Sequence, residues 1–215
     1  MFYRLPVIKR MLKEAFKAET LIVGLTKEGW FYTAGSFWIL LQDINATPKE
    51  FKAAVIELAG DLPDPGTVFR AGKSGNQMKI EQRELYVLPE AYSLIEEEGL
   101  DYRKTGILLD WGLKQPVRLI VSEDGRVGDL IRENLMRVPD PDGIEHGSGE
   151  TEIIGPAKTP DKRWYIWHND DTWYMAMPME LPADDESPLH IAQREEAMMV
   201  ARALGLAKLT DEAVK

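Results

Sequence analysis

The chain has 215 residues, contains no cysteine and carries a formal net charge of −10 at pH 7. The lack of cysteine excludes disulfides, thiolate metal sites and thiol nucleophiles, and the length suits one domain with room for an appendage. No apolar run approaches the roughly 20 residues of a membrane span, so we expect a soluble, cytoplasmic protein with no targeting segment and no membrane partner. An acidic surface should as a whole repel nucleic acid.

The first 18 residues carry the opposite charge from the rest of the chain. Five cations stand there against Glu14 alone, which gives a local charge of +4. Pro6 suits the first turn of a helix, and the following apolar residues recur with helical period on one face: Val7, Ile8, Met11, Leu12, Ala15 and Phe16. At roughly 100° per residue, four cations share the opposite arc and are named here the basic stripe: Lys9, Arg10, Lys13 and Lys17. The sequence therefore predicts an amphipathic first helix with a cationic outer face.

A three-stranded meander and a second helix are expected next. Short β-type runs cover residues 20–25, 30–33 and 36–41, with turn residues between them. Thr47, Pro48 and Glu50 match a capping box with Thr47 as the N-cap, and a Gly follows at the helix end. We expect this helix to bury four side chains: Phe51, Val55, Ile56 and Leu58.

The middle of the chain alternates polar connections with short elements. Residues 61–76 are rich in Pro, Gly and Asp and predict a long connection. Residues 89–98 predict a short acidic helix, and residues 139–150 predict a second polar connection before a strand at residues 151–154. Four further runs have the pattern of short strands: residues 78–88, 105–111, 117–122 and 126–131.

The most aromatic segment, residues 163–181, contains three of the six tryptophans. Two aromatic runs flank a polar turn at residues 168–171 and predict a hairpin. Because residues 164–167 are apolar on both faces, we expect a strand covered on both sides; an exposed platform that stacks on bases or sugars is the alternative. Residues 183–215 are expected to form an acidic linker and a C-terminal helix, which follow a single domain at residues 1–182.

The order of these elements predicts an α+β fold. We expect a largely antiparallel sheet with two or three packed helices, plus the C-terminal helix. No internal repeat is visible in the sequence.

Motifs of catalysis and cofactor binding are missing or incomplete. The segment Gly72-Lys73-Ser74 lacks the spacing of a P-loop, since five residues rather than four separate Gly66 from Gly72. His168 lies in the aspartate-rich turn, and Asn and Asp serve ordinary turns as well as metal or acid–base sites. The three histidines have no partner at metal-ligand spacing: His146, His168 and His190. We therefore predict no catalytic residue, cofactor or metal site.

The end of the aromatic segment, Tyr174-Met175-Ala176-Met177-Pro178-Met179-Glu180-Leu181, resembles the closing strand of bacterial DNA sliding clamps, which commonly ends in a Met-Pro-Met-basic-Leu run. A basic helix followed by a meander, and the turn at residues 32–36, are similar in arrangement to clamp modules. Glu180 replaces the basic residue, and the chain has room for only one to one and a half of the three modules in a clamp subunit, so a ring would require more copies. The resemblance implies helices that line a DNA-facing surface, with Lys9, Arg10, Lys13 and Lys17 as the DNA-contacting residues.

These observations predict a non-enzymatic scaffold or accessory of DNA transactions, clamp-like and related to phage or mobile elements. The basic stripe would contact phosphates without reading sequence, and copies of the chain would associate through sheet edges or the last helix. Three alternatives remain open. The stripe is only the solvated face of an amphipathic helix; the chain is an enzyme of unrecognised class that uses scattered carboxylates and His168; or the C-terminal helix is a protein-binding module.

Overall fold

The computed structural model describes residues 1–78, 102–110, 115–123, 128–140, 152–159, 164–179 and 188–203. These residues form an α+β fold, which confirms the predicted class. The helices are α1 (Leu5–Lys17), α2 (Lys49–Ala59), α4 (Glu133–Met136) and α5 (Pro188–Ala203). The strands are β1 (Leu21–Leu25), β2 (Trp30–Gly35), β3 (Trp38–Asp43), β4 (Thr67–Ala71), β5 (Gln77–Met78), β6 (Tyr102–Leu109), β7 (Val117–Ser122), β8 (Gly128–Arg132), β9 (Ile154–Lys158), β10 (Tyr165–His168) and β11 (Thr172–Ala176).

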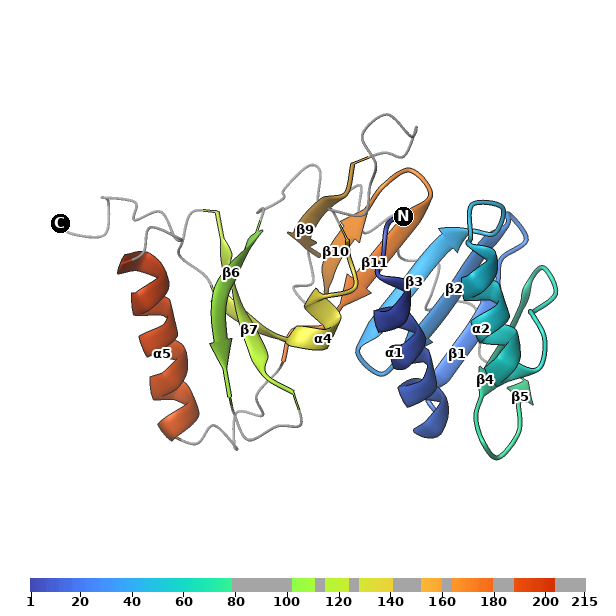
Figure 1. Cartoon of the computed structure of the whole chain (residues 1–215), viewed down its shortest axis with the longest axis horizontal. Helices are drawn as coiled ribbons and strands as arrows, with labels where there is room; N and C mark the ends of the chain where they lie inside the picture. The colour runs from blue at the N-terminus through green and yellow to red at the C-terminus, as the bar shows by residue number, and fades with distance from the viewer. Residues whose placement is uncertain are drawn as a thin grey trace.

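The strands form two antiparallel sheets (Figure 1). The larger sheet has eight strands in the order β5-β4-β1-β2-β3-β11-β10-β9, and the smaller has three in the order β6-β7-β8. The predicted meander is the centre of the larger sheet, and the predicted aromatic hairpin continues it as β11 and β10. Because β3 and β11 pair from Trp38 with Ala176 to Gln42 with Thr172, segments from opposite ends of the chain share one sheet.

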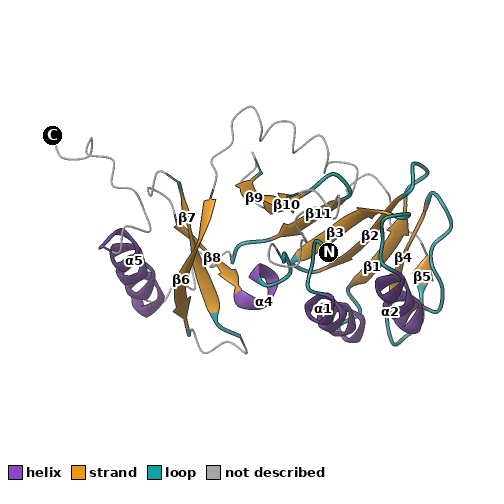
Figure 2. Ribbon diagram, turned by 45° about the horizontal axis from the view of Figure 1, so that its top comes forward, coloured by secondary structure: helices purple, strands orange, loops and turns teal. Residues whose placement is uncertain are grey.

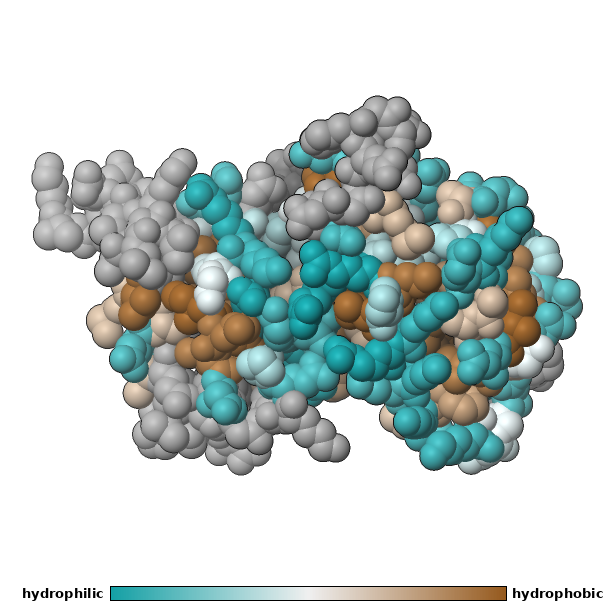
Figure 3. All heavy atoms as spheres, viewed as in Figure 1, coloured by the Kyte–Doolittle hydropathy of each residue, from teal (hydrophilic) through white to brown (hydrophobic). Residues whose placement is uncertain are grey.

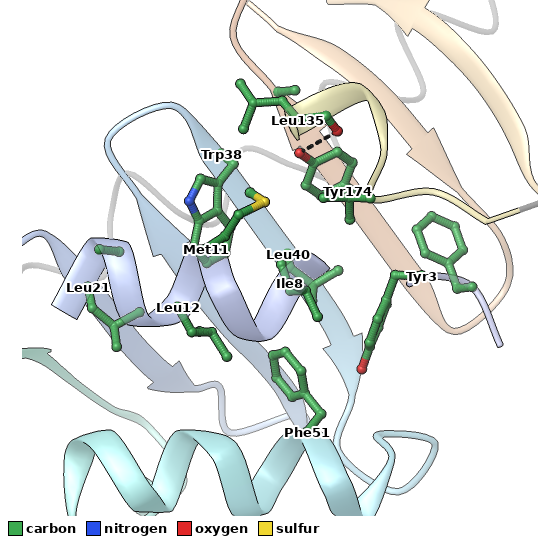
Figure 4. Packing of buried hydrophobic residues seen from close by; sticks show 14 of the residues in the cluster. Tyr3, Ile8, Met11, Leu12, Leu21, Trp38, Leu40, Phe51, Leu135 and Tyr174 are labelled. Atoms are coloured by element: carbon green, nitrogen blue, oxygen red, sulfur yellow. Dashed lines mark hydrogen bonds between the residues drawn. The ribbon is translucent and has the colours of Figure 1, made fainter. Parts of the chain in front are cut away.

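Two helices, α1 and α2, lie side by side on one face of the larger sheet (Figure 2). The inner face of α1 is the one that helical period predicts, with four fully covered side chains: Ile8, Met11, Leu12 and Ala15. The ring of Phe51 in α2 packs near that of Tyr3, with 5.5 Å between their centroids (Figure 4). The centroid of the Phe31 ring lies 6.1 Å from that of Phe51. Each large buried side chain contributes roughly 1.5–3 kcal/mol, so this packing sets the rotation of α1 about its axis.

The aromatic hairpin is covered on both faces, as expected. Tyr165 and Tyr174 are fully buried on the face that α1 covers, whereas Ile166 and Met175 are buried on the opposite face. The hydroxyl of Tyr174 donates to the carbonyl of Leu135 at 3.0 Å (Figure 4), and burial raises the pKa of this tyrosine. The phenol therefore stays protonated and fastens α4 to the sheet, and the hairpin belongs to the core rather than to a binding platform.

A half-buried polar cluster joins the two sheets. Lys158 of β9 pairs with the carboxylate of Asp129 in β8, and the Tyr165 hydroxyl donates to the same carboxylate. Burial and the neighbouring Asp129 raise the pKa of Tyr165, so the phenol remains a donor. The Lys158 ammonium also lies 5.3 Å from the centre of the Tyr165 ring. These extra contacts offset part of the cost of burying a charged pair.

The C-terminal helix α5 packs on the outer face of the smaller sheet (Figures 1 and 2). Ala197 and Met198 belong to the same apolar cluster as Leu119 and Val121 of β7. Gly128 permits this close approach, because a Cβ at that position would lie 2.2 Å from the sulfur of Met198. The helix thus contacts a sheet of its own chain.

The predicted capping box of α2 is wrong. The hydroxyl of Thr47 donates to the carbonyl of Asp43 at 2.7 Å, which orients it towards the preceding turn. Pro48 occupies the N-cap position with extended backbone and without a side-chain hydrogen bond. The competing partner in the preceding turn explains the difference.

The predicted inner face of α2 is also partly wrong. Ile56 is 41% exposed, and Leu58 is half-buried at the edge of the core. The small side chains of Ala54 and Ala59 are buried instead of Ile56. Adjacent helix positions are about 100° apart, so Ile56 turns away from the sheet when Val55 faces it.

Residues 61–76 are not one long connection, because they contain β4. Thr67–Ala71 pairs antiparallel with β1, and Phe69 is buried in the core. The predicted strand at residues 151–154 is likewise misplaced, since β9 covers Ile154–Lys158. In both places Pro and Gly residues hid the sequence pattern of a short strand. The strand β9 tolerates its proline because β9 lies at the edge of the sheet.

Other predictions fall partly or wholly outside the described residues. The strand expected at 117–122 is confirmed as β7 with the same ends, and those expected at 105–111 and 126–131 are confirmed as β6 and β8 with shifted ends. The helix expected at 89–98 lies outside, as does nearly all of the strand expected at 78–88. The connection expected at 139–150 is described only for its first two residues.

Gly24 of β1 should tolerate no side chain. A Cβ there would lie 2.1 Å from Cζ of Tyr32, its buried partner on the neighbouring strand. We expect Gly24→Ala to lower the free energy of unfolding by about 1–3 kcal/mol through overpacking, as measured by urea denaturation. The matched control is Gly106→Ala, because a Cβ at Gly106 meets no atom within 4 Å. Equal losses in the two variants would contradict the steric explanation.

Candidate functional site

The helix α1 presents the basic stripe to solvent, as its period predicts. Arg10, Lys13 and Lys17 are exposed and Lys9 is half-buried, while the apolar face of the helix packs on the sheet. Arg10 lies 4.0 Å from Glu14, with both side chains more than half exposed. Such a pair contributes only about 0.3–0.5 kcal/mol, so the stripe remains a cationic surface.

The stripe suits an extended anion better than a small one. With a rise of 1.5 Å per residue, the Cα atoms of Lys9 and Lys17 are about 12 Å apart. Duplex DNA carries one phosphate per roughly 1.7 Å of its axis. A polyanion that lies along α1 would therefore meet all four charges, whereas a single phosphate would meet one or two.

The fold gathers four cations outside the stripe, named here the second cationic group: Arg4, Lys104, Arg118 and Arg137. Arg4 is the fifth cation of the first 18 residues. Arg4 directly precedes α1, and its backbone N–H donates to the carbonyl of Val138 at 2.9 Å. This contact places Arg4 beside Arg137, the residue before Val138. The residues are far apart in sequence, so no local pattern could have indicated that they meet.

Arg118 connects the remaining members of the group. Its guanidinium forms a two-pronged pair with Glu133 at the start of α4 and also donates to the carbonyl of Thr105. Thr105 is the neighbour of Lys104 in β6. Partial burial and Arg118 lower the pKa of Lys104; Arg4 and Arg137 act in the same direction, and Glu133 opposes them. The positive field of the whole group is thus felt at Lys104.

Two hollows adjoin this region. One, of about 180 Å³, lies between α1 and α4, and the other, of about 330 Å³, is bordered by residues 177–179. Phe37 and Arg132 line both hollows, and the guanidinium carbon lies 4.3 Å from the centre of the phenylalanine ring. His168, which the enzyme alternative uses, lines neither hollow.

His168 ends β10 and is followed by an ordinary polar turn. The side-chain oxygen of Asn169 accepts hydrogen bonds from the backbone of Asp171 at 3.2 Å and Thr172 at 2.9 Å. The turn interpretation is thereby confirmed. The His168 ring lies 5.0 Å from the Trp173 ring. Of the other histidines, His146 and the side chain of His190 lie outside the described residues.

The segment at residues 72–74 and the metal-ligating side chains also lack the arrangement of a ligand site in the described part of the chain. Residues 72–74 form a turn followed by β5 rather than by the helix of a P-loop, and Ser74 donates to Glu19 at 2.5 Å. In the described part of the chain, no three metal-ligating side chains converge. None of the helices described there is long and apolar enough to cross a membrane.

The pair of Arg118 and Glu133 should be important for stability. Their side chains are only 12% and 16% exposed, so Glu133→Gln would leave a half-buried guanidinium without its carboxylate. We expect this variant to lower the free energy of unfolding by about 2–4 kcal/mol, measured by urea denaturation. Glu14→Gln, which removes an exposed partner, should change it by less than about 0.5 kcal/mol. Similar small changes in both variants would show that the buried pair does not hold β7 to α4.

Comparisons with known proteins do not place this chain in a family. No protein-family model, no curated protein and no solved structure matches it. Its function is therefore inferred from the geometry and charge of the described residues.

Proposed function

We propose that the protein is a non-enzymatic, clamp-like scaffold or accessory of DNA transactions, whose basic stripe contacts the phosphates of nucleic acid without reading the base sequence. One observation carries this proposal. Lys9, Arg10, Lys13 and Lys17 lie on the outer face of one firmly packed helix, in a chain with a net charge of −10. Contacts of this kind position a protein on nucleic acid and carry no sequence information.

The mechanism would be electrostatic. Each cation that neutralises a phosphate releases a condensed counterion, so binding weakens as salt is added. The apolar face of α1 is buried in the core, which holds the four cations in place before binding. The acidic remainder of the surface repels a polyanion, so α1 is the side that would face it.

The arrangement of the helices supports the comparison with sliding clamps. α1 and α2 lie on one face of an antiparallel sheet (Figure 2), as expected of helices that line a DNA-facing surface. The Met177-Pro178-Met179 segment directly follows β11. A ring would need several copies of the chain, which would associate through the outer strands β5 and β9 or through α5.

A protein-binding role for α5 is the second candidate. Three of its apolar side chains are exposed: Ile191, Met199 and Val200, at 38%, 62% and 42%. Exposed apolar surface of this kind is common at protein interfaces. Such a role is compatible with DNA association through α1.

We expect the wild-type protein to bind duplex DNA weakly, with a Kd on the order of 10⁻⁴ to 10⁻⁶ M at physiological salt and with a steep salt dependence. A variant with Lys9, Arg10, Lys13 and Lys17 all changed to Glu should lose this binding, because the stripe then repels phosphates. Fluorescence anisotropy with labelled duplexes of unrelated sequence measures both.

The control for this variant reverses two charges elsewhere, at Lys27 and Arg70. Both side chains are exposed; Lys27 lies in the turn after β1, and Arg70 projects from the sheet face opposite α1, because its neighbours Phe69 and Ala71 point into the core. The control should bind DNA at least half as well as wild type. Unchanged binding in the four-residue variant would rule out the basic stripe as the contact surface.

A further inference from the structure

The second cationic group lies next to the basic stripe. Arg4 is the residue that precedes α1, and the Arg4–Val138 hydrogen bond ties the start of α1 to the segment after α4. Figure 3 shows hydrophilic side chains gathered over α4 and α1 on the face seen in Figure 1. Arg4 and Arg137 therefore lie next to the start of α1, the helix that carries the basic stripe.

Within the described part of the chain, two carboxylates pair with members of the second cationic group. Glu133 is engaged by Arg118, and Asp140 accepts a hydrogen bond from Arg4 at 3.0 Å. Lys104 and Arg137 are exposed, and within the described residues neither forms an ion pair. Among the described residues, these four cations and the two carboxylates that pair with Arg4 and Arg118 sum to +2.

The like charges of the second cationic group lower the pKa of one of its members, Lys104. Partial burial is the largest cause of the lowered pKa of Lys104; the charges of Arg118, Arg4 and Arg137 add to it, and Glu133 opposes it. Perturbed groups of this kind occur at functional sites more often than elsewhere. The first turn of α1 contains no acidic residue. The positive end of the helix dipole therefore adds to the positive electrostatic field of the second cationic group. An anion placed beside Lys104 and Arg137 would relieve the repulsion.

We propose that Lys104 and Arg137, together with Arg4, form a second phosphate-contacting site, which is occupied by the same nucleic acid that lies along the basic stripe. This inference rests on the proposed function. It makes the contact surface wider than one helix, with β6, the segment after α4 and the start of α1 each supplying a cation. Arg118 is a positioning residue, because its pair with Glu133 and its bond to Thr105 hold β6 and β7 against α4.

Three double variants of the full chain test this inference, each removing two positive charges. The first is Lys104→Gln with Arg137→Gln, the second is Lys13→Gln with Lys17→Gln, and the control is Lys27→Gln with Arg70→Gln. The Kd for a labelled duplex of about 20 base pairs is measured over a range of salt concentrations. The first and second variants should each reduce the slope of log K against log salt by about 2, and the control should leave the slope within experimental error.

The outcomes separate this inference from the proposed function. If the Lys104 and Arg137 variant behaves like the control while the Lys13 and Lys17 variant loses slope, the second site is overturned and the proposed function stands. If wild type shows no salt-dependent binding, both are overturned. Lys104→Arg with Arg137→Lys keeps both charges and should retain the wild-type slope. Loss of slope in that variant too would indicate a structural effect and would also overturn the second site.

Discussion

The pairing of β3 with β11 is the interaction on which the rest of the molecule depends. Five residue pairs, from Trp38 with Ala176 to Gln42 with Thr172, join the meander to the aromatic hairpin. Hydrogen bonds from Asp43 to Asp171 and from Met177 to Phe37 continue the contact beyond both ends of these strands. Since α1 packs on the meander and Tyr174 of β11 fastens α4, this pairing brings the basic stripe beside the second cationic group.

Much of the fold could be predicted from local patterns in the sequence. The period of α1, the meander and the two-sided apolar run in the aromatic hairpin are strong over short distances, and the structure agrees with them. Predictions failed where a side chain had another hydrogen-bond partner nearby, or where Pro and Gly residues hid the pattern of a short strand. Thr47 bonds to Asp43 rather than to the helix, and β4 lies within a stretch whose Pro and Gly content indicated only a connection.

The basic stripe and the second cationic group differ in how far the sequence predicts them. The basic stripe is visible in the sequence because one helix carries all four cations. The second cationic group is not, because Arg4 meets Arg137 through the Val138 contact and Lys104 meets Arg118 through Thr105. The helix α4, which organises this region, has only four residues and leaves no periodic signal. Tertiary contacts alone assemble that part of the surface.

The most direct test of nucleic-acid contact at α1 and its neighbours is to measure the chemical reactivity of individual lysines with and without DNA. Acylation of the native protein, followed by mass spectrometry, reports the accessibility of each ammonium group. A nucleic acid seated on α1 and its neighbours should slow modification of Lys13, Lys17 and Lys104 and leave Lys27 unchanged. Equal rates with and without DNA at all four lysines, at a DNA concentration that saturates binding, would contradict the claim.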